Sequence, residues 1–264
     1  MGHPLDLVKV RMQANPTSYP TLLYSVQTIL QTEGVSGFFK GLSVPLFTAG
    51  VTNAALFAFY GTSKRVVASL SGTDNVIDLS LPQICAASIL AAPFYCVVLT
   101  PIEVLKVNLQ NQAAASVQSP FRAARALGLS GLYKGYLPTL GSRWTGSPAY
   151  FCSYEASKSF FIDNQIIEET NIMGVGLICG YLAGVCFWSV NFPLDLIKTR
   201  IQTNAKTDLN PWKVAHRIIQ NEGGVSALYR GFLPCILRSG PANAVAFGGY
   251  ELGMQWFNDH PSQS

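Results

Sequence analysis

A ten-residue pattern that occurs three times along the chain constrains its fold more than any other feature. Each copy has a proline, an acidic residue two positions later, a lysine five positions later and a glutamine nine positions later. The copies begin at Pro4, Pro101 and Pro193, so their starts are 97 and 92 residues apart. A glycine-rich stretch follows each copy, at residues 33–41, 128–135 and 222–231. Repetition at this period indicates an architecture of three similar structural units.

Uncharged stretches long enough to cross a membrane accompany these motifs. A crossing needs about 20 residues of helix. Three runs carry no charge, namely residues 41–63, 79–102 and 170–194. Two further runs, 135–154 and 231–250, carry one charge each, and a sixth crossing is implied by the motif that begins at Pro4. The chain is therefore predicted to be an all-α membrane protein, a bundle of six helices.

The composition agrees with this class and excludes several others. Only 12% of the residues are charged, about half the usual fraction in soluble domains. The six cysteines form no C-x-x-C pair or zinc spacing, so no metal ion and no cofactor are expected. Paired carboxylates, a nucleophile with its base and a phosphate-binding loop are all absent from the sequence pattern. The protein is therefore not expected to be an enzyme.

The charges divide unevenly between the two ends of such a bundle. The end that holds the repeated motifs has thirteen Lys and Arg against six Asp and Glu, and the opposite end has three against eight. A basic end fits the positive-inside bias and attraction to anionic lipid head groups. Because the basic residues flank membrane spans and lack interleaved aromatic residues, nucleic acid is not expected as a partner.

The three motifs resemble the signature of the mitochondrial carrier family, P-x-[DE]-x-x-[KR]-x-[KR] followed by a glycine-rich [DE]-G element. The resemblance covers essentially the whole chain and implies three carrier repeats, at residues 1–68, 79–163 and 171–259. It implies six tilted transmembrane helices around a central cavity, with short helices on the matrix side. Most of helix 1 precedes the first signature proline in the family, so we expect helix 1 to be truncated at its N-terminus here. We favour a sequence that lacks its true start over a protein that is naturally short.

The resemblance also implies a setting. We expect a multi-pass protein of the mitochondrial inner membrane that alternates between a cytoplasm-open and a matrix-open state. The motif-bearing, basic end then faces the matrix. The expected partners are a small-molecule substrate and the lipid bilayer, with cardiolipin on the matrix side, and the protein is expected to be a monomer.

The motif carboxylates and lysines are candidates for a gate at the matrix end. Ionisable groups inside a membrane are costly unless they pair with one another. In the order that the family uses, the resemblance gives three pairs: Asp6–Lys106, Glu103–Lys198 and Asp195–Lys9. The family has bracing glutamines one turn further along, which here are Gln13, Gln110 and Gln202. We call these nine residues the matrix gate; static ion pairs at helix ends are the alternative.

A second gate is expected at the cytoplasmic end, where the family has [FY]-[DE]-x-x-[KR] on the even-numbered helices. The motif is complete at residues 154–158, lacks its acid at Gly61 and lacks its base at Met254. Cyclic pairing leaves two links, Lys64–Glu155 and Lys158–Glu251. Both charges of the third pair are missing, so neither partner stays uncompensated. We predict a two-link gate, weaker than the matrix gate, and a matrix-open state that forms less readily.

Arg143 and Arg238 are candidates for substrate contact because each is the only charge in an apolar span. Such a residue is a functional-site hypothesis, with structural pairing as the alternative. Arg238 lies twelve residues before Tyr250, which matches the substrate-contacting position of the family's sixth helix. Residues 238–247 are similar to carnitine/acylcarnitine and basic amino-acid carriers, and His3 lies at a cavity-lining position by the same resemblance. Arg143 falls where this branch has an acid.

The chemistry of these residues limits the substrate class. Two arginines suit a carboxylate group, and the middle of the cavity offers no carboxylate for a basic substrate. Trp144 and Trp188 are candidates to face a quaternary ammonium group by cation–π contact, with a lipid-facing position as the alternative. The hypothesis is a transporter of carnitine derivatives or amino acids. A nucleotide, cofactor or dicarboxylate carrier and a non-transporting truncated form stay open, as do exchange, uniport and proton coupling.

Overall fold

The computed structural model describes residues 2–72, 75–76, 79–111, 119–163, 172–203 and 209–238, without the side chains of 155, 158, 162–163 and 172–177. The described residues form helices and the turns between them. The long helices are α3 (Ser43–Leu70), α4 (Leu81–Asn111), α6 (Tyr136–Asp163) and α7 (Ile172–Thr203), and α1 (His3–Ala14) is shorter. The connecting helices are α2 (Leu22–Glu33), η1 (Val35–Phe39), α5 (Pro120–Leu132), α8 (Pro211–Asn221) and η4 (Val225–Tyr229).

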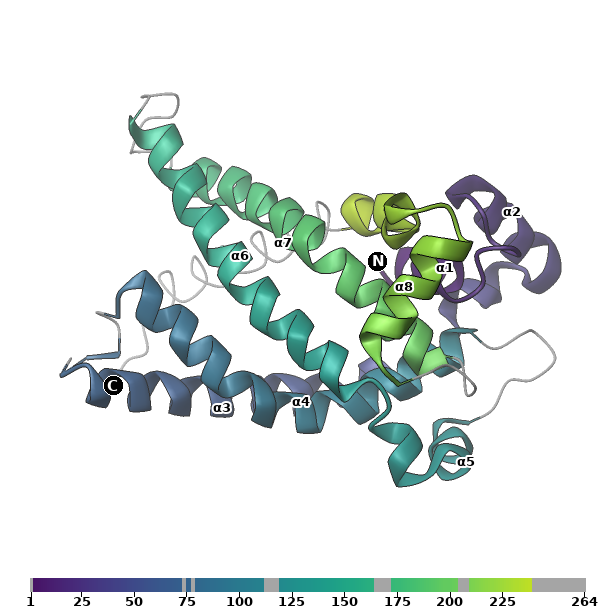
Figure 1. The fold of residues 1–264 in the computed structure, drawn as a ribbon, viewed down its shortest axis with the longest axis horizontal. Coiled ribbons are helices and arrows are strands. Elements are labelled where there is room, and N and C mark those ends of the chain that lie inside the picture. Colours follow the sequence, from purple (N-terminus) through teal and green to yellow (C-terminus); the bar gives the residue numbers. More distant parts are fainter. Residues whose placement is uncertain are drawn as a thin grey trace, which may run out of the picture.

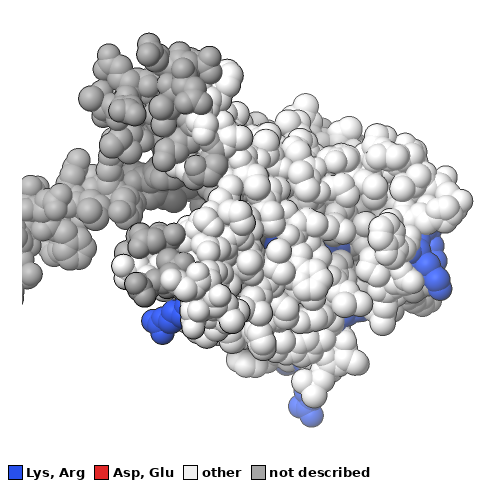
Figure 2. Space-filling model, turned by 60° about the vertical axis from the view of Figure 1, so that its left-hand side comes forward, with Lys and Arg blue, Asp and Glu red and all other residues white. Residues whose placement is uncertain are grey.

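The described helices present the surface of a membrane protein. Three helical segments in this part of the chain are long and apolar enough to cross a bilayer: Val35–Leu70, Leu81–Asn111 and Ile178–Thr203. Figure 2 shows a face on which most of the described atoms belong to uncharged residues, with Lys and Arg visible in only a few places. Large apolar side chains, such as those of Phe47, Phe57 and Phe94, are exposed on the helices. Such a surface is stable in lipid and costly in water.

The short helices gather at one end of the long ones. In Figure 1, α1, α2, α5 and α8 lie toward the right, and the far ends of α3, α6 and α7 lie toward the left. Three of these helices, α2, α5 and α8, start with polar N-caps: the side chains of Thr21, Ser119 and Asn210 each accept a hydrogen bond from a backbone N–H of the first turn. An N-cap satisfies a donor that the helix itself leaves unpaired.

Two motif prolines inside the long helices are tolerated because side chains replace the hydrogen bonds that they remove. A proline has no N–H, so it frees the carbonyl four residues earlier. Pro101 frees the carbonyl of Val97, which accepts a hydrogen bond from the Tyr133 hydroxyl at 3.1 Å. Pro193 frees the carbonyl of Ser189, which accepts a hydrogen bond from the Tyr229 hydroxyl at 3.0 Å. α4 and α7 therefore continue through their motif prolines.

Three equivalent glycines join each repeat to the next in a circle. Gly41, Gly135 and Gly231 have φ angles of 75°, 86° and 82°, a conformation in which a side chain is strained. A Cβ on Gly41 would lie 3.1 Å from Gln110 Cγ, and one on Gly135 would lie 3.0 Å from Gln202 Cγ. A Cβ on Gly231 would lie 3.4 Å from the Lys9 carbonyl oxygen. Repeat 1 therefore contacts repeat 2, repeat 2 contacts repeat 3 and repeat 3 contacts repeat 1.

Candidate functional site

Six charged side chains of α1, α4 and α7 form a closed ring of ion pairs. Lys106 Nζ lies 3.2 Å from Asp6 Oδ2, Lys198 Nζ lies 2.8 Å from Glu103 Oε2, and Lys9 Nζ lies 2.7 Å from Asp195 Oδ2. Each pair joins two different helices, so together the pairs link all three motif-bearing helices. The structure thus brings together every acid and lysine of the expected matrix gate, in the expected partnerships.

The ring encloses a small polar cavity of about 170 Å³. All six ring residues line it, together with Gln13, Gln110, Trp188 and Arg238 among others. Lys9 Nζ lies 4.2 Å from the centre of the Trp188 ring, so a cation–π contact adds to its ion pair. Lys9 and Lys198 are buried, and partly desolvated pairs of this kind attract more strongly than surface pairs.

The three glutamines differ in what they contact. Gln13 Nε2 donates to Asp195 Oδ2 at 3.4 Å, next to the pair that Asp195 makes with Lys9. The side chains of Gln110 and Gln202 are buried and have no hydrogen-bond partner among the described residues. They pack instead against Gly41 and Gly135 of the neighbouring repeats. Only Gln13 therefore contacts an ion pair directly in this conformation.

Arg143 and Arg238 reach the carboxylates of the ring. Arg238 Nε lies 2.8 Å from Asp6 Oδ1, and Arg143 Nη2 lies 3.7 Å from Glu103 Oε1. Two ring acids are thus shared between a lysine and an arginine. The sequence pattern predicted Asp6 and Glu103 as gate acids but did not predict that the two arginines would reach them.

A second set of ion pairs holds the connecting helices against the motif helices. Arg11 of α1 donates two hydrogen bonds to Glu33, at 2.7 and 2.9 Å, and Lys40 lies 2.7 Å from the same carboxylate. Arg200 and Arg230 contact Glu222 in repeat 3 at 2.7 and 2.9 Å. The acid of each of these pairs belongs to the [DE]-G element of the sequence, which could have predicted them. Repeat 2 has Leu127 and Asn108 at the acid and arginine positions.

The pKa of the Glu33 carboxyl shows how strongly Arg11 and Lys40 hold this side chain. Burial by itself raises the pKa of the Glu33 carboxyl, but hydrogen bonds from Arg11 and Lys40 outweigh it. The net pKa lies below the ordinary value of 4.5. The carboxylate therefore stays ionised and paired at neutral pH, which fixes the end of α2 to α1.

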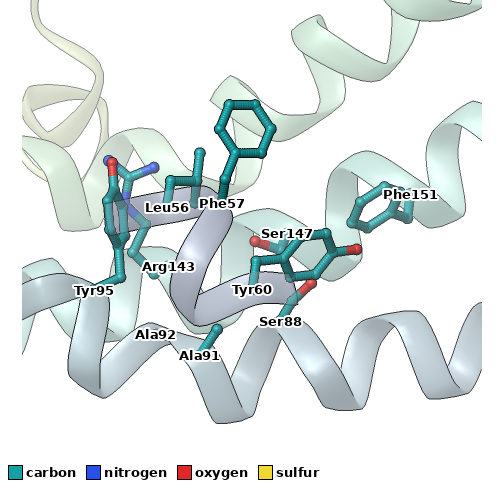
Figure 3. Close-up of a pocket in the computed structure, with 10 residues that line it drawn as sticks. All are labelled: Leu56, Phe57, Tyr60, Ser88, Ala91, Ala92, Tyr95, Arg143, Ser147 and Phe151. Atoms are coloured by element: carbon teal, nitrogen blue, oxygen red, sulfur yellow. The ribbon is translucent and has the colours of Figure 1, made fainter. Parts of the chain in front are cut away.

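A larger, apolar cavity of about 290 Å³ lies between α3, α4 and α6. Ten residues line it, most of them aromatic or aliphatic, and Figure 3 shows Arg143 beside Tyr95 at one end of the group. The Arg143 guanidinium carbon lies 5.5 Å from the centre of the Tyr95 ring. Sequence reasoning missed this cavity; the available signal was Tyr95, two turns before Glu103 on the same helix.

Comparison with known proteins identifies the family. A family model described as mitochondrial carrier protein matches residues 1–70, 78–165 and 171–261. The chain belongs to the mitochondrial carrier family. It is therefore a transporter and not an enzyme, a three-repeat helical bundle that spans the mitochondrial inner membrane several times.

Several relatives of this carrier are similar over almost their whole length. Mitochondrial substrate carrier family protein S of Dictyostelium discoideum is 34% identical over 263 residues, 95% of this chain and 90% of that protein. The human mitochondrial carnitine/acylcarnitine carrier protein is 32% identical over 274 residues, 98% of this chain and 89% of that protein. Mouse mitochondrial ornithine transporter 1 is 33% identical over 264 residues, 95% and 87% respectively.

Trp144 and His3 have structural contacts in this carrier. The indole N–H of Trp144 donates to the Ile89 carbonyl at 3.0 Å. Ile89 stands four residues before Pro93, so Trp144 satisfies the carbonyl that Pro93 frees. Trp144 is exposed and lines neither of the two cavities described above. His3 Nε2 lies 3.0 Å from the Lys40 carbonyl oxygen, and His3 likewise lines neither cavity.

The cytoplasmic gate falls largely outside the described part of the carrier. Lys64 Nζ lies 5.0 Å from the centre of the Tyr60 ring. The side chains of Glu155 and Lys158, and the whole of Glu251, lie outside the described residues. The two-link cytoplasmic gate therefore stays a prediction.

Proposed function

We propose that this carrier moves a small carboxylate-bearing metabolite, a carnitine or acylcarnitine or an amino acid, across the inner membrane by alternating access. The observation that carries the proposal is the pairing of Arg143 and Arg238 with ring acids at the cavity. Each guanidinium is held in the membrane by a carboxylate, and a substrate carboxylate offers it an equivalent partner. The likeness to carnitine/acylcarnitine carriers and to an ornithine transporter supports the same substrate range.

The same pairs suggest how the substrate is received. A substrate carboxylate competes with Asp6 and Glu103 for the two arginines. A zwitterion suits the cavity best, because its ammonium group replaces the arginine that its carboxylate draws away. A dicarboxylate or a nucleotide brings further negative charge toward Asp6 and Glu103, which like-charge repulsion disfavours. This argument ranks a zwitterion ahead of the nucleotide, cofactor and dicarboxylate alternatives.

The six-residue ring is proposed to close the matrix side in each transport cycle. The three pairs hold α1, α4 and α7 together, and separating these helices exposes the cavity to the matrix. Each link is reversible, since its charges regain water or new partners when the helices part. We further propose that the carrier works as a monomer with cardiolipin on its basic matrix end, which native mass spectrometry of the purified carrier measures directly.

Uptake into proteoliposomes tests the substrate proposal. The purified carrier is expected to exchange radiolabelled carnitine or an amino acid, and Arg238→Ala is expected to reduce the rate by about 10- to 100-fold, because a hydrogen bond to a charged group contributes about 1.5–3 kcal/mol. Arg122→Ala is the matched control, since Arg122 is exposed on α5, and it should transport normally.

Two results would contradict the proposal. One is undiminished exchange in Arg238→Ala. The other is a wild-type carrier that moves nucleotides or dicarboxylates but neither carnitine nor amino acids. A wild-type protein that transports nothing would favour the non-transporting form.

A further inference from the structure

We propose that Cys85 of α4 and Cys152 of α6 form a redox-sensitive dithiol site, which a hydroperoxide oxidises to a disulfide that arrests transport. Formation of the disulfide is independent of the proposed function, and only the arrest of transport rests on it. The two cysteines lie outside the three repeated motifs and outside the ion-pair ring.

The two thiols are in contact across the interface between α4 and α6. The Cys85 side chain hydrogen-bonds with the Cys152 side chain, and both cysteines are free thiols in this structure. A disulfide requires the two sulfur atoms to lie about 2.05 Å apart. Thiols that are already in hydrogen-bond contact need only a small further approach to reach that distance.

The pair also differs from the other cysteines of α4 and α7 in its exposure. Cys152 is exposed and Cys85 is partly exposed, whereas Cys96 and Cys179 are buried. A buried cysteine acts as a small apolar residue of the core. An accessible thiol beside a second thiol has the arrangement of a redox sensor with its resolving cysteine. Cys152 is therefore the residue that reacts first, and Cys85 is the resolving residue.

The pair lies far from the ion-pair ring along the helices. Cys85 stands near the start of α4, and Glu103 lies roughly 27 Å further along the helix axis at about 1.5 Å per residue. Phe151, the neighbour of Cys152, lies in Figure 3 at the far end of the group from Arg143, which contacts the ring. The dithiol is therefore placed toward the end of the bundle opposite the ring, where the cytoplasmic gate is predicted.

This position explains why a disulfide would arrest transport. The predicted cytoplasmic gate includes Glu155, three residues after Cys152, and its predicted partner is Lys64 on α3. Closing that gate brings the end of α6 toward α3, whereas a disulfide ties the same part of α6 to α4. The oxidised carrier would therefore stay in the conformation in which the ring is closed.

The oxidation balances with hydrogen peroxide as the oxidant. The Cys152 thiolate attacks one peroxide oxygen, the O–O bond breaks, and the products are a sulfenic acid and a hydroxide that takes up the thiol proton to become water. The Cys85 thiol then attacks the sulfenic sulfur, the S–O bond breaks, and a second water leaves with the Cys85 proton. Two thiols lose two electrons in total, and hydrogen peroxide is reduced to two water molecules.

Peroxide treatment of the purified carrier in proteoliposomes tests the inference. After treatment the remaining thiols are alkylated, and the protein is digested without reduction for mass spectrometry. Wild type is expected to yield a cross-linked peptide that contains Cys85 and Cys152. Its exchange of labelled carnitine or amino acid should fall in proportion to the fraction of carrier that is cross-linked. Dithiothreitol should reverse both changes by thiol–disulfide exchange.

Serine variants assign the effect to this pair. Cys85→Ser and Cys152→Ser should each prevent the cross-link and keep their exchange rate after the same treatment. Cys186→Ser is the matched control, because Cys186 is an exposed cysteine of α7, and it should respond to peroxide as wild type does. Because Cys152 is exposed, Cys152→Ser keeps the test available if Cys85→Ser fails to fold.

The outcomes separate this inference from the proposed function. No cross-link in oxidised wild type, a cross-link between two chains instead, or an internal cross-link with undiminished exchange would each overturn the inference and leave the proposed function standing. Loss of exchange in oxidised Cys152→Ser would overturn it as well. A reduced wild type that exchanges neither carnitine nor an amino acid contradicts the proposed function, and the cross-linked peptide then still decides for or against the dithiol site.

Discussion

At the scale of single residues, side-chain donors replace backbone hydrogen bonds that prolines remove from the helices. Trp144, Tyr133 and Tyr229 each donate to a carbonyl four residues before a proline. Repeat 1 has Phe39 at the position that corresponds to Tyr133 and Tyr229. Each of these three donors therefore satisfies a carbonyl that a proline frees.

This role predicts what replacing Trp144 will do. Trp144→Phe removes the donor and leaves the Ile89 carbonyl unsatisfied in lipid, which should destabilise the carrier by about 1–3 kcal/mol. Thermal unfolding in detergent measures the loss, and exchange by the surviving protein should keep its substrate affinity. Trp212→Phe, at an exposed tryptophan of α8, is the control. A normal melting temperature with weakened substrate binding would instead favour a direct contact with the substrate.

At the scale of helices, α6 and α7 pack more closely than any large side chain would allow. A Cβ on Gly146 of α6 would lie 2.4 Å from a ring carbon of Phe187 on α7. Small residues let helix backbones approach in a membrane, where dispersion contacts rather than water drive association. Gly141 lies on the same helix, and a Cβ there would meet no atom of a neighbouring element within 4 Å in the described part of the chain.

The two glycines make a matched pair of variants. Gly146→Ala forces α6 and α7 apart or displaces Phe187, and overpacking of this kind costs about 1–3 kcal/mol. Gly141→Ala should be neutral or stabilising by up to about 1 kcal/mol, because alanine favours helix more than glycine does. Thermal unfolding of both variants decides the matter. Equal melting temperatures would show that the contact at Gly146 contributes nothing.

The helices also show how far sequence reasoning reaches. Uncharged runs located the spans, but they ended the second at residue 102 and the third at residue 194. The helices continue to Asn111 and Thr203. An uncharged run ends at the first acid of the motif, because a charged residue is taken to mark the end of a membrane span. The ion pairs keep these residues inside the bundle, and the tyrosine hydroxyls let the helices pass the prolines.

At the scale of the whole molecule, a closed ring of three ion pairs joins the three repeats. The period of the sequence and the family resemblance together predicted the partners of Asp6, Glu103 and Asp195, because equivalent residues in a threefold bundle face a common axis. They did not predict that Arg143 and Arg238 would contact two of those acids. Side-chain reach and helix tilt determine that contact, and motif spacing contains neither. The apolar cavity was not predicted either, because residues from three helices form it and motif spacing does not show how those helices pack.

The central claim is that mutual attraction within the ring closes the matrix side during transport. Lys9 and Asp195 are the best pair for a test, because neither contacts Arg143 or Arg238 in the described part of the carrier. The measurement is the substrate exchange rate in proteoliposomes of Lys9→Asp, Asp195→Lys and the double variant. Each single change places like charges together and should lower the rate at least tenfold, since breaking a buried pair costs about 3–5 kcal/mol. The double variant restores an opposite pair and should recover most of the wild-type rate; a double variant as inactive as the single ones, or single variants with normal exchange, would contradict the account.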